Sequence, residues 1–256
     1  MQQPIVKAAV LKKSIVPSFF AGVMVALALR RLRRTVVAQP VSDGAPFAAL
    51  DAYVERQMSR QNMPGAALVV VEGERIVHKR GFGRARPGGD APSPQTPFVL
   101  GSITKSFTAL AVMQLVEAGR IELDAPVQRY LPWFQVADRE ASARITVRHL
   151  LNQTSGLPQL HGLVTLTDFD DSPIATERQV RALAAVALSH PPGAAFEYSN
   201  SNYNVLGLVV EVAGGESYAD YIQAHLFDPL GMAHSFTSQA AAKRDGLAVG
   251  HRHWFT

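Results

Sequence analysis

An α+β fold is predicted by the order in which hydrophobic patterns follow one another along the 256 residues. Apolar residues at helical spacing come first, and two short β-rich runs come second. A long section with mostly helical spacing then continues to about residue 235. We expect the β-rich runs to begin an antiparallel sheet flanked by helices, and the long section to add a large helical region after it.

The first elements are a helix and a hairpin. Apolar residues recur at helical spacing up to a Pro-Gly turn, which predicts a helix over residues 47–61. The β-rich runs are residues 66–71 and 75–79, and a turn around Gly73 separates them. Two such runs joined by a short turn are typical of a β-hairpin.

The helical section begins with a helix predicted over residues 102–118, with Gly119 in place to end it. Four shorter helices are predicted after it, over residues 146–151, 177–188, 203–212 and 218–226. Thr146 is the expected N-cap of the first of these.

The sheet should need more strands than the hairpin provides, because two strands alone are seldom stable. Only residues 247–256 follow the last part of the helical section. We therefore expect the sequence to be a fragment or a truncated reading frame that lacks the C-terminal strands of its sheet.

Composition argues against several classes of function. The chain has no cysteine, which excludes disulfides, thiolate metal sites and a cysteine nucleophile. Its pI of about 9.5 would favour nucleic acid as a partner. However, residues 1–34 hold seven basic residues and no acidic one, and the remainder has 18 basic against 21 acidic residues. No nucleic-acid partner is therefore predicted.

Residues 1–40 are predicted to be a signal peptide or membrane anchor with a linker, ahead of one domain over residues 41–256. An apolar stretch at residues 15–29 has the length of a signal-peptide core and falls short of a comfortable membrane span. Four arginines follow it, which is unusual for a cleavage site, so an uncleaved anchor through residues 14–34 is the alternative. A buried helix or a mis-assigned start would also explain the pattern. We expect an exported protein, periplasmic or membrane-anchored.

Ser102 and Lys105 stand three residues apart in the first turn of a predicted helix, so both side chains lie on one face. A serine becomes a strong nucleophile when a neighbour takes its proton, and a lysine does so only where burial or nearby cations keep it neutral. The positive end of the helix dipole and the N–H of Ser102 could help to hold an oxyanion. The alternative is an N-cap serine beside a solvated lysine, but only three lysines follow residue 34, against 15 arginines.

Tyr198-Ser199-Asn200 lies in a polar stretch ahead of another predicted helix. The phenol could exchange protons with Ser102 and a leaving group, and the Asn200 amide could bind an amide of the substrate. A purely structural loop would have the same composition. The candidate catalytic residues are thus Ser102, Lys105 and Tyr198, with Asn200 as a candidate substrate-binding residue.

These residues carry a resemblance to a known family. Ser102-Ile-Thr-Lys105 resembles the Ser-x-x-Lys motif of serine β-lactamases and penicillin-binding proteins, and Tyr198-Ser-Asn200 resembles the Tyr-x-Asn motif of the class C branch. The resemblance extends over about residues 47–253 and includes the blocks 123–127, 130–132, 149–158 and 227–232.

The resemblance implies a β-lactamase-like fold and a two-step acyl transfer. Ser102 would attack a carbonyl of a small-molecule or peptide substrate, Lys105 and Tyr198 would move the proton, and water would later release the acyl group. Neither a metal ion nor a cofactor is implied. The glutamate-bearing loop of class A enzymes has no match, so deacylation would depend on Tyr198.

One departure keeps a second interpretation open. The family's third motif, Lys or His followed by any residue and then Gly on a strand, has no match after Tyr198, since His251-Arg-His253 lacks the glycine. The protein could therefore be a non-catalytic, membrane-tethered relative that serves as a binding or scaffold protein. Among hydrolases, β-lactamase, D-alanyl-D-alanine peptidase and esterase share the candidate residues.

The remaining histidines and aromatic residues are given structural roles. His251 and His253 have no third ligand nearby, so no metal site is predicted. His149 is expected to be packed or capped within its short helix. Trp133 and Phe134 are expected in the core.

Overall fold

The computed structural model describes residues 46–164, 172 and 174–250. The predicted leader lies outside this part of the chain, as do His251 and His253. Within the described part, no helix is both long enough and apolar enough to cross a membrane. The chain divides into two compact units, residues 1–54 and 55–256. The described part of the first unit is a turn and the beginning of helix α2 (Ala48–Gln61).

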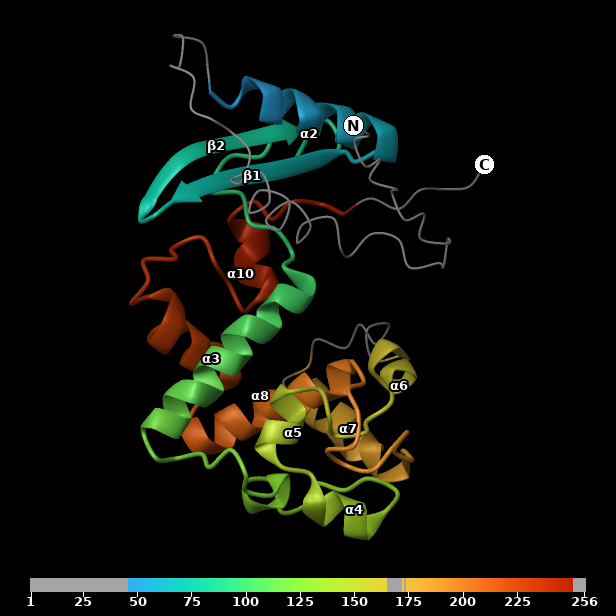
Figure 1. The fold of residues 1–256 in the computed structure, drawn as a ribbon. Helices are drawn as coiled ribbons and strands as arrows, with labels where there is room; N and C mark the ends of the chain where they lie inside the picture. Colours follow the sequence, from blue (N-terminus) through green and yellow to red (C-terminus); the bar gives the residue numbers. More distant parts are fainter. Residues whose placement is uncertain (1–45, 165–171, 173, 251–256) are drawn as a thin grey trace, which may run out of the picture. The chain divides into compact units, whose positions relative to one another are not determined.

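The predicted hairpin is present in the second unit as strands β1 (Gly65–Glu72) and β2 (Arg75–Gly83). Figure 1 shows them as two antiparallel arrows joined by a tight turn. Gly65 pairs with Gly83, and a bulge between Val70 and Val71 shifts the register. β2 runs four residues beyond the prediction because its pairing with β1 continues to Gly83. In the described residues these strands form a two-stranded sheet.

The helix predicted over residues 102–118 begins differently from the prediction. Residues Gly101–Ile103 form a 3-10 turn, η1, and the α-helix α3 then runs over Thr104–Glu117. Ser102 therefore lies in the tighter turn ahead of the α-helix. Such turns are frequent at helix N-termini because the first backbone N–H groups have no partner within the helix. The C-terminal end agrees with the prediction, with Ala118 as C-cap and Gly119 at a φ of 68°.

The helical region after α3 consists mostly of short helices, with one long helix among them. The α-helices are α4 (Arg139–Arg144), α5 (Val147–Leu151), α6 (Gln159–Val164), α7 (Ala175–Arg181), α8 (Asn200–Gly214), α9 (Tyr218–Ile222) and α10 (Gln239–Arg244). The tighter or wider turns are η2 (Val127–Arg129), η4 (Ala182–Ala185) and the π-helical η5 (Gln223–Phe227).

All four short helices predicted in this region are present, with different ends. The helix predicted over residues 177–188 begins at Ala175 and tightens into η4, which ends at Ala185. α8 begins three residues earlier than predicted. α4, α6 and α10 were not predicted, because six residues are too few to show a helical period. Between residues 174 and 250 the structure describes no strand.

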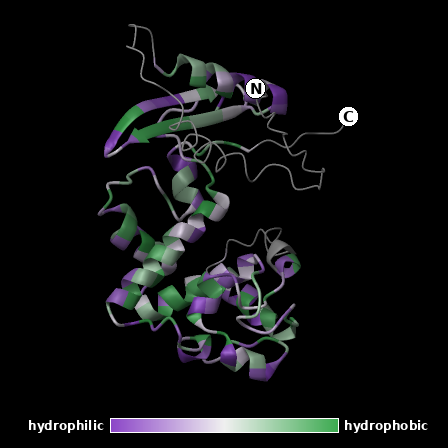
Figure 2. Ribbon diagram, in the orientation of Figure 1, coloured by the Kyte–Doolittle hydropathy of each residue, from purple (hydrophilic) through white to green (hydrophobic). Residues whose placement is uncertain are grey.

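The core of the helical region is built around α8. Its side chains Val205, Leu206 and Val209 are fully buried, and the helix contacts α3, α5, α7 and α9. α3 contributes Ala111, Val112 and Leu115 to the same core. Figure 2 shows hydrophobic stretches along both helices. Burial of these apolar faces is the main favourable term holding the two helices together.

Local predictions for four residues in this region can now be compared with the structure. Thr146 is the N-cap of α5, and its Oγ1 accepts a hydrogen bond from the N–H of His149. His149 returns the contact, since its Nδ1 accepts from the N–H of Thr146, so its predicted capping role is confirmed. Phe134 is fully buried as expected. Trp133 is only partly buried, and Arg181 stacks over its ring at 4.0 Å.

The central position of α8 leads to a stability prediction. Leu206→Ala should lower the free energy of unfolding by about 2–5 kcal/mol, because it opens a cavity where the side chain has no exposure. Leu230→Ala is the matched control, since that side chain is 63% exposed and should change stability far less. Urea unfolding of both variants measures the difference. Equal losses in the two would contradict the central role of α8.

Candidate active site

Ser102 and Lys105 are positioned by the sharp entry into α3. Gly101 has a φ of +55°, a conformation that favours glycine because it has no Cβ, and the chain turns there directly into η1. The Nζ of Lys105 donates a hydrogen bond to the Oγ of Ser102 at 3.3 Å. The two side chains therefore share one face of the helix start, as the spacing predicts.

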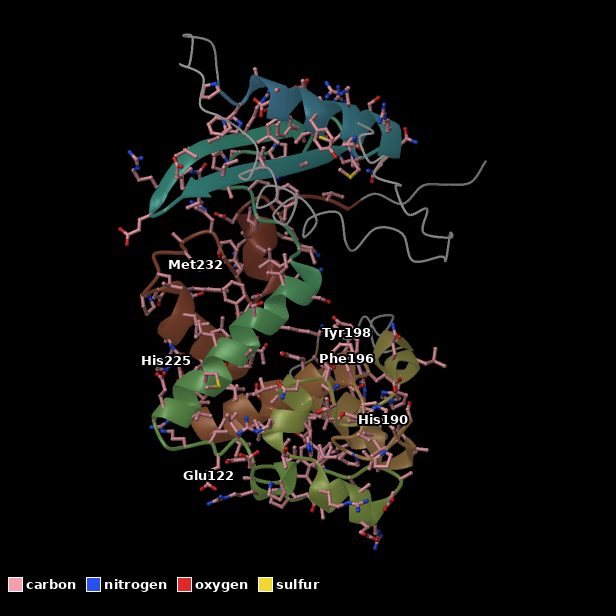
Figure 3. All side chains as sticks on the ribbon, viewed as in Figure 1. Glu122, His190, Phe196, Tyr198, His225 and Met232 are labelled. Carbon is pink, nitrogen blue, oxygen red and sulfur yellow. The ribbon has the colours of Figure 1, made fainter. Side chains whose placement is uncertain are left out.

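Tyr198 reaches the same point from the segment that leads into α8. Its Oη lies 2.6 Å from the Oγ of Ser102, and either hydroxyl could be the donor. In Figure 3, Tyr198 and Phe196 lie close together on this segment. Because Lys105 donates to Oγ, the proton of the Ser102 hydroxyl is free to point at Tyr198.

Asn200 contacts Lys105 directly. Its Oδ1 accepts a hydrogen bond from the Nζ of Lys105 at 2.7 Å. Asn200 is the first residue of α8, and Ser199 ahead of it has an extended backbone. The structure thus brings all four residues singled out in the sequence into one hydrogen-bonded group, although 93 positions separate Lys105 from Tyr198 (198 − 105 = 93).

Two tyrosine rings surround the ammonium group of Lys105. Its Nζ lies 5.0 Å from the ring centroid of Tyr198 and 5.7 Å from that of Tyr203. Both distances are in the range of cation–π attraction. Burial, and then the neighbouring Tyr198, raise the pKa of the Tyr203 phenol. The Tyr203 hydroxyl donates to the carbonyl of Leu151 at 3.2 Å, so it is directed away from Ser102.

Exposed apolar side chains stand next to the site residues in the chain. Ser102 is itself exposed. Its chain neighbours Leu100 and Ile103 are 45% and 48% exposed, and Phe196 is 69% exposed. An exposed apolar rim beside polar groups is typical of a surface that another molecule covers. Sequence reasoning missed this rim, because apolar residues next to a helix start usually indicate core.

Two further residues near the site were also missed. The sequence predicted Tyr203 only as the first residue of a helix. Its contact with Lys105 could not be predicted, because it depends on how α8 packs against α3. Gln153 lies within a block that resembles the family, but nothing in the sequence assigned it a role. In the structure its side chain accepts a hydrogen bond from the N–H of Ser199. The block itself, residues 149–158, was the only available signal.

Among the described residues, no group of three or more His, Asp or Glu side chains is arranged to hold a metal ion. The donors gathered around Ser102 are a phenol, an ammonium group and an amide. This set is suited to proton transfer and hydrogen bonding to a substrate.

Comparison with known proteins gives the family. The beta-lactamase family model matches residues 50–256. Penicillin-binding protein 4 of Amycolatopsis lactamdurans is 39% identical over 196 residues, which cover 75% of this chain and 50% of that protein. The chain belongs to the beta-lactamase family, and the predicted resemblance is confirmed.

Solved structures agree on the fold. The octameric penicillin-binding protein homologue from Pyrococcus abyssi has a TM-score of 0.69 and 30% identity, and the match covers 80% of this chain and 48% of that one. EstCE1, a hydrolase with promiscuous acyltransferase activity, has a TM-score of 0.63 and 28% identity, with 72% and 51% covered. The predicted α+β, β-lactamase-like fold is therefore confirmed. The chain spans 40% to 50% of the length of the curated relatives it matches.

The raised pKa of Tyr203 predicts a loss of stability at alkaline pH. Above pH 10.0, the ordinary pKa of a tyrosine, the unfolded chain releases the phenol proton of Tyr203. The folded protein still holds that proton, because its pKa is raised. The free energy of unfolding should therefore fall as the pH rises through 10.0 and up to the pKa of the folded state. Tyr203→Phe should make this fall shallower. Urea unfolding across that range measures it, and identical slopes in wild type and variant would contradict the assignment.

Proposed function

We propose that the protein is a serine hydrolase that acts by acyl transfer on a carbonyl substrate. The observation that carries the proposal is the contact of the Ser102 Oγ with a phenol and an ammonium group at once, Tyr198 Oη at 2.6 Å and Lys105 Nζ at 3.3 Å. A hydroxyl held between a phenol and an ammonium group at the start of a helix has little structural purpose on an exposed surface. It is the arrangement that nucleophilic catalysis needs.

In the first step the Oγ of Ser102 bonds to the carbonyl carbon of the substrate. Its proton passes to the Oη of Tyr198, and Tyr198 passes its own proton to the leaving group as the bond to that group breaks. Lys105 receives an electrostatic role here in place of the proton-transfer role expected from the sequence, because its Nζ donates to both Ser102 and Asn200. Its positive charge favours the negative charge that develops between the Oγ of Ser102 and the Oη of Tyr198. The N–H of Ser102, at the positive end of α3, is the proposed first donor to the oxyanion.

In the second step water attacks the carbonyl carbon of the acyl-enzyme. Tyr198 accepts a proton from that water and returns one to the Oγ of Ser102 as the acyl bond breaks. Asn200, already bonded to Lys105, would turn its amide N–H groups toward an amide of the substrate. Every proton is accounted for by groups of the chain, the substrate and water.

β-Lactam, peptide and ester carbonyls all remain within the proposed substrate class. The named relatives include penicillin-binding proteins and a hydrolase with acyltransferase activity, and the chain is related to both. The four candidate residues suit each of these carbonyls, since the fold does not select the substrate. We also infer from the leader that the enzyme acts outside the cytoplasm, in the periplasm or anchored to a membrane.

The first experiment measures the intact mass of the full chain after exposure to a fluorophosphonate and, separately, to a penicillin. We expect a single adduct on the wild type and none on Ser102→Ala, because the label reacts with an activated serine. Circular dichroism of both proteins controls for folding. A folded wild type that takes up neither label would instead favour the alternative, a binding or scaffold relative without catalytic activity.

The role of Tyr198 predicts a second result. Tyr198→Phe should slow acylation of Ser102 by about 10²–10⁴-fold, the usual contribution of a positioned acid–base group. Tyr203→Phe is the matched control, since it removes a hydroxyl that bonds Leu151 and not Ser102. Rates of adduct formation in the two variants give the comparison. Equal rates would exclude Tyr198 as the proton carrier.

A further inference from the structure

Gln153 is a buried polar residue that the proposed mechanism does not use. It is 6% exposed, and its φ of +60° places it in the left-handed region, which is uncommon for a residue other than glycine. Such a conformation persists only where the surroundings stabilise it, and it is often found beside functional sites. The contacts of Gln153 therefore need an explanation.

Those contacts go to the segment that carries Tyr198 and Asn200. The backbone carbonyl of Gln153 accepts a hydrogen bond from the N–H of Glu197 at 2.8 Å. Its side-chain Oε1 accepts another from the N–H of Ser199 at 2.9 Å. One residue thus holds the backbone on both sides of Tyr198, and the second bond lies between Tyr198 and Asn200.

The same Oε1 also reaches helix α8. It accepts a hydrogen bond from the Nδ2 of Asn202 at 2.6 Å, so both lone pairs of this oxygen are used. The N–H of Ser199 can only donate, which identifies the atom facing it as the amide oxygen of Gln153 and not the amide nitrogen. Both bonds therefore require an acceptor at this position.

A second set of buried bonds fixes Asn202 and Ser199 in turn. The Oδ1 of Asn202 accepts from the Oγ of Ser155 at 2.5 Å, and the Oγ of Ser199 donates to the carbonyl of Pro158 at 3.1 Å. Ser155, Ser199 and Asn202 have at most trace exposure. The bonds of this buried network make it rigid, because each broken bond would leave a buried group without a partner.

We propose that Gln153 is a positioning residue, whose carbonyl and side-chain oxygens clamp the backbone around Tyr198 and hold its hydroxyl on Ser102. The proposal rests on the proposed function, because it assigns Gln153 a role in the acyl transfer by Ser102. Tyr198 must lie within hydrogen-bond reach of Ser102 to carry a proton, and a displacement of about 1 Å can cost ~100-fold in rate. The clamp supplies that precision from residues outside the reacting group.

The test uses the full chain and variants that separate the acceptor from the side-chain volume. Gln153→Met keeps the length and removes the acceptor, whereas Gln153→Glu keeps an acceptor oxygen for both N–H groups. Gln128→Met is the matched control, since Gln128 bonds the carbonyl of Phe134 away from the site. Two quantities are measured for each: the rate at which fluorophosphonate labels Ser102, and hydrogen exchange of the Ser199 amide.

We expect Gln153→Met to slow labelling of Ser102 by about 10- to 100-fold and to speed exchange of the Ser199 amide. Gln153→Glu should restore most of the labelling rate and most of the protection of the Ser199 amide. Gln128→Met should change neither the labelling rate nor the exchange rate. In the background of Tyr198→Phe, the effect of Gln153→Met on labelling should largely disappear, because the two residues act through one contact. A loss that came only from general destabilisation would persist in that background.

Labelling of Gln153→Met at the wild-type rate would overturn the proposal, as would unchanged exchange of the Ser199 amide. If Gln153→Met does not fold, Gln153→Asn replaces it, because asparagine tolerates a positive φ and its oxygen is one methylene short. A wild type without any adduct would reject the proposed function. The exchange measurement would then still decide whether Gln153 anchors the backbone at Ser199, so the two failures can be told apart.

Discussion

Burial of α8 is the constraint on which the rest of the helical region depends. One face of this helix is buried, and the helix contacts α3, α5, α6, α7 and α9, so packing fixes its position. The N-terminal end of α8 is where Tyr198 and Asn200 enter the site. Their distances from Ser102 and Lys105 are therefore consequences of how the hydrophobic core closes.

The four residues of the candidate site are held in place in two different ways. Ser102 and Lys105 are held by one helix start, so their separation follows from local backbone geometry. Tyr198 and Asn200 come from a loop, and a loop holds a side chain in place only where other groups fix its backbone. The buried bonds from Gln153 to Glu197 and Ser199 provide that support. The cost of burying so many polar groups is offset because their hydrogen bonds are made.

Membership of the beta-lactamase family and the geometry around Ser102 both support the proposed acyl transfer. Within the acyl transfer proposed above, the choice of substrate depends on the side chains around the reacting carbonyl. Leu100, Ile103 and Phe196 are exposed and stand close in sequence to the site residues. They would favour an apolar group next to the reacting carbonyl, because covering them removes apolar surface from water.

Local spacing was enough to predict the α+β class, the hairpin, Ser102 and Lys105 on one face, and the Thr146 cap, because each follows from a pattern within a few residues. Six-residue helices such as α4 and the 3-10 turn at Ser102 escaped prediction, since short segments carry too little periodicity. Tertiary packing alone sets the 2.6 Å contact between Ser102 and Tyr198, the approach of Tyr203 to Lys105 and the clamp by Gln153. These contacts join residues about 45 to 100 positions apart, and such distances are set by how helices pack in the core and not by any local pattern.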